Sequence, residues 1–183
     1  MNKLSFTTVT LLSCFAISSC SQDLNDYSQH KNAFDIKEYF NGNVTAWGTI
    51  QDASDVVTRR FCVELQGTWK HGDGVLAEKF YFDDGEISYR NWHFSQQSDG
   101  HYIGTAEDVI GEAIGWQQGF AFNLTYTLLL PVDGSTYEVS MDDWMYQLDQ
   151  NRVINKTAIN KFGVNVANVT LFFDKQPPVK GCQ

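Results

Sequence analysis

The feature that most constrains the fold is an Asp-Gly pair that recurs between short runs of β-favouring residues. The pairs are Asp84-Gly85, Asp99-Gly100 and Asp133-Gly134, and Val, Ile, Thr and aromatic residues dominate their flanks. Asp-Gly is typical of tight hairpin turns, because type I′ turns need positive φ at both central positions. From residue 44 onward the chain has no long stretch of helical periodicity. The sequence therefore predicts an all-β domain with antiparallel neighbouring strands.

Ten strands are expected, and the residues alone leave a barrel and a sandwich open as architectures. A short helix is expected over residues 34–40, stopped by Asn41-Gly42. The expected strands cover residues 44–50, 57–66, 75–83, 86–95, 101–107, 119–130, 135–141, 143–149, 152–159 and 162–173.

The N-terminus has the features of a bacterial export signal over residues 1–19. A short positive start precedes an apolar run over residues 4–15, which is too short to span a bilayer. Ile17-Ser18-Ser19-Cys20 then resembles a lipobox, in which the cysteine becomes the first mature residue and carries diacylglycerol and an acyl chain such as palmitate. We therefore expect a lipid anchor on Cys20. An Asp after the lipidated cysteine would suggest retention in the inner membrane, but Ser21 stands there. We therefore expect the protein to be anchored at the periplasmic face of the outer membrane.

The predicted organisation is a signal peptide (1–19), a lipidated cysteine with a flexible tether (20–33), a β-domain (34–175) and a tail (176–183). The signal contains one lysine and no acid, so its removal changes the formal net charge from −9 to −10. An acidic chain lacks the basic surface that nucleic acids and anionic head groups require. Membrane attachment should therefore depend on the lipid, and no nucleic-acid partner is expected.

Cys62 and Cys182 are the remaining cysteines of the mature chain, and the envelope permits disulfides. A bridge between them and two separate thiols both fit the sequence. The four histidines show no metal-ligand spacing, and the paired acids read as solvated turn residues. No nucleophile elbow, phosphate loop or dinucleotide fingerprint occurs. We therefore predict no catalytic residue, metal or cofactor.

One hairpin yields candidate ligand-binding residues. If Asp84-Gly85 is a two-residue turn, Lys79 lies opposite Arg90, and two like charges are tolerated only on a solvent-facing side. The opposite, inward face is then predicted to carry Glu78, Phe80, Tyr89, Asn91 and His93. Polar groups among apolar ones inside a barrel fit a ligand cavity, and they also fit a satisfied structural network.

Two tryptophans complete the candidate pocket. Trp69 ends Gly67-Thr68-Trp69, which matches the Gly-x-Trp signature of lipocalins, although it follows the second expected strand and not the first. Trp116 lies in the glycine-rich segment 104–119. Glycines in a curved sheet mark bulges and bends, or places where a ligand approaches the backbone.

Longer strings carry a family resemblance: Phe34–Gly42, Arg59-Arg60-Phe61, Phe80–Glu86, Asp143–Tyr146 and Asn155-Lys156-Thr157. Across roughly 34–175 the chain resembles DUF3833, a family of proteobacterial lipoproteins of unknown function. The resemblance implies a lipocalin-like, or calycin-like, fold and brings no established activity. Members are often encoded beside enzymes of fatty-acyl modification, and this association suggests a function connected with lipids. With the resemblance to this family, the expected fold becomes an antiparallel up-and-down barrel of about eight to ten strands with a short N-terminal helix.

These features lead to one main functional hypothesis and two alternatives. The main hypothesis is an envelope lipoprotein that binds or carries an apolar ligand, such as a fatty acid or phospholipid, inside its barrel. The first alternative is a structural or assembly partner of an envelope protein complex. The second alternative is an enzyme that modifies a lipid or isoprenoid, which would need Glu78, Asn91 and His93 to meet in a cavity.

Overall fold

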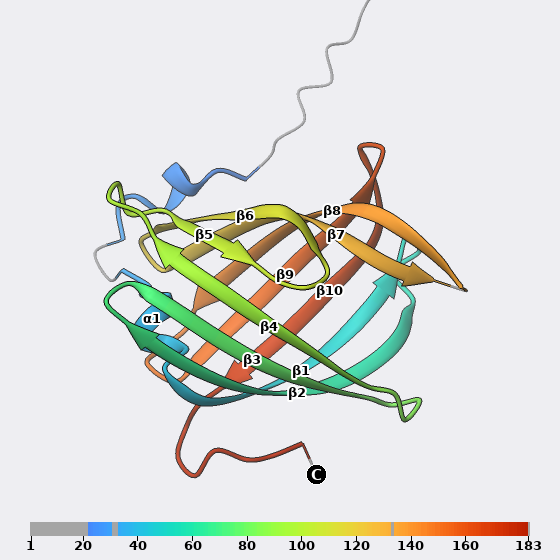
Figure 1. Cartoon of the computed structure of the whole chain (residues 1–183), viewed down its shortest axis with the longest axis horizontal. Coiled ribbons are helices and arrows are strands. Elements are labelled where there is room, and N and C mark those ends of the chain that lie inside the picture. The colour runs from blue at the N-terminus through green and yellow to red at the C-terminus, as the bar shows by residue number, and fades with distance from the viewer. Residues whose placement is uncertain (1–21, 31–32, 133, 183) are drawn as a thin grey trace, which may run out of the picture.

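The computed structural model describes residues 22–30, 33–132 and 134–182. A 3-10 turn, η1 (Leu24–Tyr27), and one helical turn, α1 (Ile36–Tyr39), precede ten strands (Figure 1). The strands are β1 (Gly42–Asp52), β2 (Val57–Lys70), β3 (Asp73–Phe82), β4 (Ile87–Gln96), β5 (Tyr102–Thr105), β6 (Val109–Gln118), β7 (Ala121–Val132), β8 (Ser135–Gln147), β9 (Arg152–Lys161) and β10 (Val164–Asp174).

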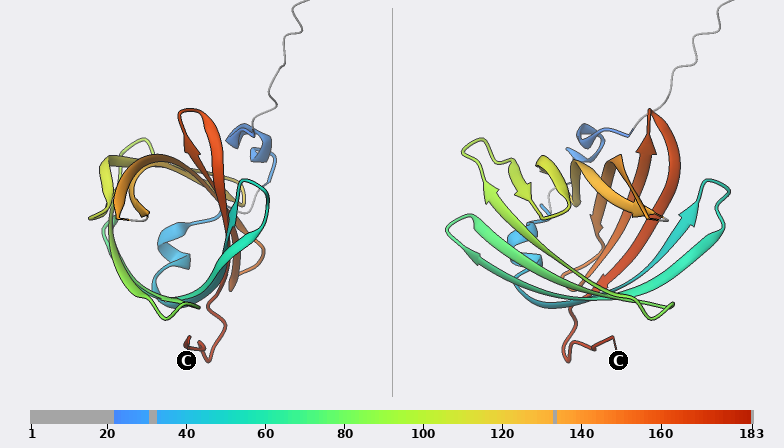
Figure 2. Two further views of the ribbon diagram at one scale, coloured as in Figure 1. Left: turned by 90° about the vertical axis from the view of Figure 1, so that its right-hand side faces the viewer. Right: turned by 45° about the vertical axis from the view of Figure 1, so that its right-hand side comes forward.

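The strands form one closed up-and-down barrel. Each strand pairs with its neighbours in chain order, and β1 pairs antiparallel with β10 to close the ring. Figure 2 shows this ring end-on in its left view, with α1 inside it near one end. The predicted all-β, antiparallel, lipocalin-like barrel is confirmed. None of the described helices is long and apolar enough to cross a bilayer.

The ten observed strands are not the same ten that the sequence predicted. Residues 109–118 form β6, a strand that was not predicted because glycines interrupt this segment. The two strands expected over residues 135–141 and 143–149 are one continuous strand, β8. Gly111, with φ +70°, lies where the β6–β7 register shifts between Ile110 and Ile114. A bulge at this glycine therefore bends β6, as glycine allows at low cost.

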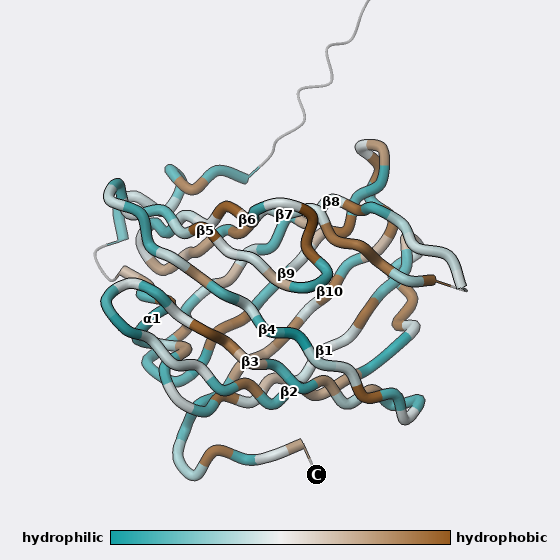
Figure 3. The backbone as a smooth tube through the Cα atoms, in the orientation of Figure 1, coloured by the Kyte–Doolittle hydropathy of each residue, from teal (hydrophilic) through white to brown (hydrophobic). Residues whose placement is uncertain are grey.

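Strand side chains alternate between the interior and the outer wall, as the period of two requires. On β2, Phe61, Val63 and Leu65 are buried, whereas Cys62 and Glu64 between them are partly exposed. Figure 3 shows the corresponding change between hydrophobic and hydrophilic positions along the strands. The barrel interior is therefore the hydrophobic core of the protein.

Helix α1 fills one end of the barrel. The Asp35 side chain caps its start by accepting a hydrogen bond from the Lys37 backbone N–H at 2.8 Å. At its other end, Lys175 Nζ donates to the carbonyl oxygens of Glu38 and Tyr39 at 3.1 and 2.8 Å. The flanking apolar residues are almost fully buried: Phe34, Ile36, Tyr39 and Phe40. This end of the barrel is therefore closed by packed side chains.

Gly67, the first residue of the Gly-x-Trp signature, lies against this plug. A Cβ atom at position 67 would lie 1.6 Å from the carbonyl oxygen of Phe40, so only glycine permits the observed contact. Trp69 of the same signature packs on Phe94, with ring centroids 6.0 Å apart, and on Tyr102 at 6.4 Å. The signature therefore contributes to closing the α1 end of the barrel.

Residues 22–30 and the described segment after β10 both pack against the outside of the barrel. Tyr27 of η1 contacts Phe120 with ring centroids 5.1 Å apart, and the Gln22 side chain donates a hydrogen bond to the Tyr146 hydroxyl. Residues 22–30 of the predicted tether are thus folded onto the domain. Cys20 and the predicted signal peptide lie outside the described residues.

The C-terminal tail returns along the outer wall to β2. Cys182 and Cys62 form a disulfide with their Cα atoms 5.7 Å apart, so the bridged alternative applies. The Cys182 backbone N–H also donates to Glu64 at 3.0 Å. The tail is therefore fixed to the barrel by a covalent bond and by hydrogen bonding.

Candidate functional site

The barrel encloses a cavity of about 600 Å³. It extends from Ile36 and Phe40 at the plugged end to Glu86, Val132 and Gly134 in hairpins at the opposite end. Because those hairpin residues are exposed, the cavity reaches solvent at this open end. Its lining is mainly aliphatic and aromatic. Volume and lining both lie within the range of small-molecule sites.

A band of polar side chains crosses the middle of this apolar cavity. It is built by β3, β4, β7, β8 and β9, each of which turns one or two polar residues inward. Asp108, from the β5–β6 connection, adds a further carboxylate. The members of this polar band are Glu78, Arg90, Asp108, Tyr126, Asp143, Asn155 and Thr157.

The cation of the polar band is held by an ion pair. Arg90 Nη2 lies 2.6 Å from Asp108 Oδ2, and Arg90 Nε donates to both carboxylate oxygens at 3.1 Å. The next residue, Asn91, donates through its backbone N–H and its Nδ2 to Glu107 at 3.2 and 3.1 Å. Because β5 pairs only with the far half of β4, these side chains tie the near half of β4 to the β5–β6 connection. Arg90 is thus already occupied as a charge partner.

Two carboxyl groups of the polar band titrate near neutrality. Burial raises the pKa of Glu78 to about 7, although the nearby Arg90 opposes the shift. Burial also raises the pKa of Asp143 to about 7, against hydrogen bonds from Asn155 and Thr157. Close to pH 7 each group is therefore present in both its neutral and its charged form.

The same region contains a phenol without a partner. Tyr126 is 9% exposed and lines the cavity, and its hydroxyl has no hydrogen-bond partner among the described residues. Burial, followed by the charge of Asp143, raises its pKa above the ordinary value. Tyr126 is therefore a neutral hydroxyl that can donate or accept inside the cavity.

The open end combines ion pairs with exposed apolar residues. Arg59 Nη2 lies 2.6 Å from Asp84 and 2.9 Å from Glu86, and its guanidinium stacks 3.7 Å from the Phe82 ring centroid. Around it, the hairpins expose an apolar rim, in which Phe162 is 96% exposed. The apolar rim consists of Val56, Ile87, Val132, Phe162 and Val164.

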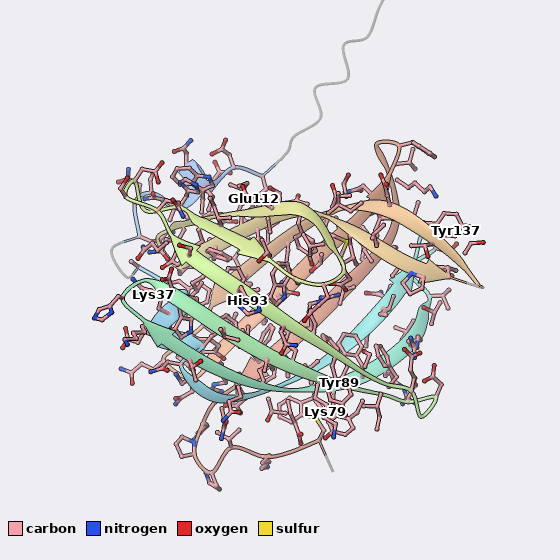
Figure 4. The ribbon with its side chains drawn as sticks, in the orientation of Figure 1. Lys37, Lys79, Tyr89, His93, Glu112 and Tyr137 are labelled. Atoms are coloured by element: carbon pink, nitrogen blue, oxygen red, sulfur yellow. A yellow bond between two sulfur atoms is a disulfide. The ribbon has the colours of Figure 1, made fainter. Side chains whose placement is uncertain are left out.

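The prediction that Tyr89, Asn91 and His93 face the interior is wrong. In the structure Glu78 pairs with Arg90, so β4 is shifted by one residue from the predicted register. Tyr89 is 69% exposed beside Lys79 on the outer wall, where Figure 4 shows both side chains, and His93 is also exposed. A one-residue slip exchanges the two faces of a strand, so Arg90 and Trp92 point inward instead.

The cause of the shift is the length of the turn. The Phe82 N–H donates to the Glu86 carbonyl and the Gly85 N–H donates to the Phe82 carbonyl, each at 3.0 Å. The loop therefore has three residues, 83–85, with Gly85 at φ +89°. This is the type I turn followed by a left-handed glycine, which also favours Asp-Gly.

The structure places the other predicted residues as follows. Glu78 and Phe80 line the cavity, and Trp69 lines its plugged end. Trp116 does not line it, because the residue is 43% exposed on the outer wall, where its ring stacks on His101 with centroids 5.0 Å apart. Within β6 the inward positions belong to Ala113 and Gly115. The cluster of Glu78, Asn91 and His93 does not form.

Sequence reasoning missed most of the polar band. Asp142-Asp143 is one of the acidic pairs that the sequence predicts to be solvated turn residues, whereas Val139, Met141 and Asp143 follow the inward period of two on one strand. Asn155 and Thr157 show the same period on β9, where Val153 and Ile159 are buried on either side. No local pattern could have identified Asp108, because its role depends on Arg90. Among the described residues, no three His, Cys, Asp or Glu side chains are grouped closely enough to hold a metal ion.

The fold is shared with a solved protein of distant sequence. The S-type phycobiliprotein lyase CPES from Guillardia theta superposes with a TM-score of 0.54 at 6% identity, over 84% of this chain and 96% of that chain. None of the curated proteins matches this chain. The model of DUF3833, a protein family of unknown function, matches residues 14–175. The chain therefore belongs to the DUF3833 family.

Proposed function

We propose that the protein is an envelope lipoprotein whose barrel binds or carries an apolar ligand, such as a long-chain lipid. The observation that carries this proposal is the cavity of about 600 Å³, which is plugged by α1 at one end and reaches solvent at the other. Cavities of this size bind one small molecule. Burial of a hydrocarbon chain provides about 0.8 kcal/mol per methylene group, so an apolar lining favours such a ligand.

The ligand can be tested on the full chain carrying Cys20→Ala, so that no acyl group of its own is present. Native mass spectrometry of the purified protein is expected to show a non-covalent adduct of lipid mass that is lost on collisional activation. The neutral fluorophore N-phenyl-1-naphthylamine is expected to brighten when added to stripped protein. The absence of both an adduct and a fluorescence response would remove the proposal.

The anchor is a separate part of the proposal and has its own test. With a net charge of −9 and no basic patch suggested by the composition, membrane attachment is assigned to acyl chains on Cys20. The wild type should incorporate labelled palmitate and sediment with membranes, whereas Cys20→Ala should do neither. Cys14→Ala is the matched control and should behave as wild type. Labelling of Cys20→Ala would overturn the assignment.

The apolar rim favours a second candidate function, which is contact with an envelope protein. The five residues of the apolar rim are exposed at the open end, and Phe162 is almost completely exposed. A photo-crosslinking residue at position 162 should capture a reproducible neighbour in intact cells. The same residue at position 116 on the outer wall is the control. If both positions give the same products or none, the rim is not an interface.

A further inference from the structure

The charges that line the cavity are unbalanced. Among the described lining residues there are two cations and four carboxyl groups, namely Arg59 and Arg90 against Glu78, Glu86, Asp108 and Asp143. Both cations are already paired, Arg59 with Glu86 and Arg90 with Asp108. The remaining carboxyls, Glu78 and Asp143, have no cation of their own. A ligand in the cavity therefore meets spare acceptors and no free cation.

Tyr126 gives independent evidence that a polar group belongs at this position. Its side chain is 9% exposed and lines the cavity, and its hydroxyl forms no hydrogen bond with the other described residues. Polar groups inside a protein normally find a hydrogen-bond partner. A ligand with a polar end at mid-barrel would supply the missing partner.

We propose that the cavity selects an apolar ligand whose polar end donates hydrogen bonds and carries no negative charge, with a protonated primary amine as the best match. This inference rests on the proposed function and specifies its ligand. An ammonium group has three donors and a positive charge, which suit Glu78, Asp143 and the Tyr126 oxygen. A carboxylate would instead add a negative charge where no cation is free, and an unpaired buried charge is strongly disfavoured.

The preference for an amine should depend on pH, because titratable and charged groups from several strands face the polar end of the ligand. These are Glu78 on β3, Arg90 on β4, Asp108 beside it, Tyr126 on β7 and Asp143 on β8. On β9 the facing groups are uncharged, and β1, β2 and β10 add only Arg59, near the open end. Because Glu78 and Asp143 become neutral as the pH falls below about 7, amine binding should weaken in acid.

The experiment compares three ligands with the same chain and different ends. Dodecylamine, dodecanol and dodecanoate, each below its aggregation concentration, compete with N-phenyl-1-naphthylamine for the full chain carrying Cys20→Ala. At about pH 8 the amine should compete at a concentration about tenfold or more below that of dodecanoate, which corresponds to about 1.4 kcal/mol. At about pH 5.5 that ratio should shrink, because the carboxylates are protonated.

Variants assign the effect to the cavity. Glu78→Gln and Asp143→Asn should each reduce the preference for the amine, whereas Glu112→Gln, an exposed carboxyl on β6, should leave it unchanged. Bound fluorophore shows that each variant is folded. Equal competition by dodecanoate and dodecylamine in the wild type would overturn the inference while leaving the proposed function intact. Failure of the fluorophore to bind the wild type would count against the proposed function itself.

Discussion

Replacement of Glu78 by glutamine should stabilise the protein at alkaline pH. Burial raises the pKa of Glu78 from 4.5 to about 7, so the folded state holds the proton more tightly than the unfolded state. Each pH unit between the two values corresponds to about 1.4 kcal/mol, which gives a cost of about 3 kcal/mol when the group is ionised. Glutamine resembles the protonated carboxyl and removes that cost.

The direction in which stability changes with pH follows from how tightly the folded and unfolded states bind the proton of Glu78. The stabilising contribution of neutral Glu78 is complete below pH 4.5 and is lost as the pH rises through about 7. Asp143 acts in the same direction between 3.8 and about 7, and the two effects do not add because the groups interact. The wild type should therefore be less stable at about pH 8.5 than at about pH 5, and Glu78→Gln should be less affected by the change.

Urea unfolding followed by tryptophan fluorescence measures this difference. At about pH 8.5 the midpoint of Glu78→Gln should exceed that of the wild type, and at about pH 5 the two midpoints should nearly coincide. Glu112→Gln, which removes an exposed carboxyl, should match the wild type at both values. If Glu78→Gln and the wild type lose equal stability between the two pH values, Glu78 is not a desolvated carboxyl and the reasoning fails.

Three further predictions concern packing and cross-linking. Gly67→Ala places a Cβ 1.6 Å from the Phe40 carbonyl oxygen, so it should lower the free energy of unfolding by about 1–3 kcal/mol or more, seen as a lower urea midpoint. An unchanged midpoint would mean that α1 is not packed as described. The Cys62–Cys182 bridge spans 120 residues, so Cys62→Ser should cost up to about 5 kcal/mol by the loop-entropy relation and should abolish any effect of a reducing agent on unfolding. Tyr126→Phe should unfold within about 0.5 kcal/mol of the wild type, because its hydroxyl has no partner, yet should bind dodecylamine more weakly than the wild type; equal binding would show that the hydroxyl faces no ligand.

An apolar interior could be predicted from the sequence, but most of the polar residues that line the cavity could not. Alternating apolar residues and turn pairs require a sheet with one apolar face, and closing such a sheet produces an apolar interior. Glu78 and Phe80 face inward as predicted, although the opposition of Lys79 and Arg90 that identified their face does not occur, because Arg90 pairs with Glu78. Asp108 could not be predicted, because it lies in a connection after β5 and acts only through Arg90 on another strand. Such a pair is a property of the closed barrel and not of any local segment.

The sequence by itself determined the all-β class, the antiparallel hairpins and the inward face of β3, because strand alternation has a period of two residues and is local. The tertiary structure decided the inward face of β4. Asp-Gly suits both a two-residue and a three-residue turn. In the structure the turn has three residues, and residues outside the hairpin contact its first residue, Asp83. The Asp83 N–H donates to the Arg60 carbonyl at 3.0 Å, and Arg60 Nε donates to Asp83 at 2.9 Å. These contacts with β2 place Asp83 in the loop, and that single residue brings Arg90 into the cavity in place of Asn91.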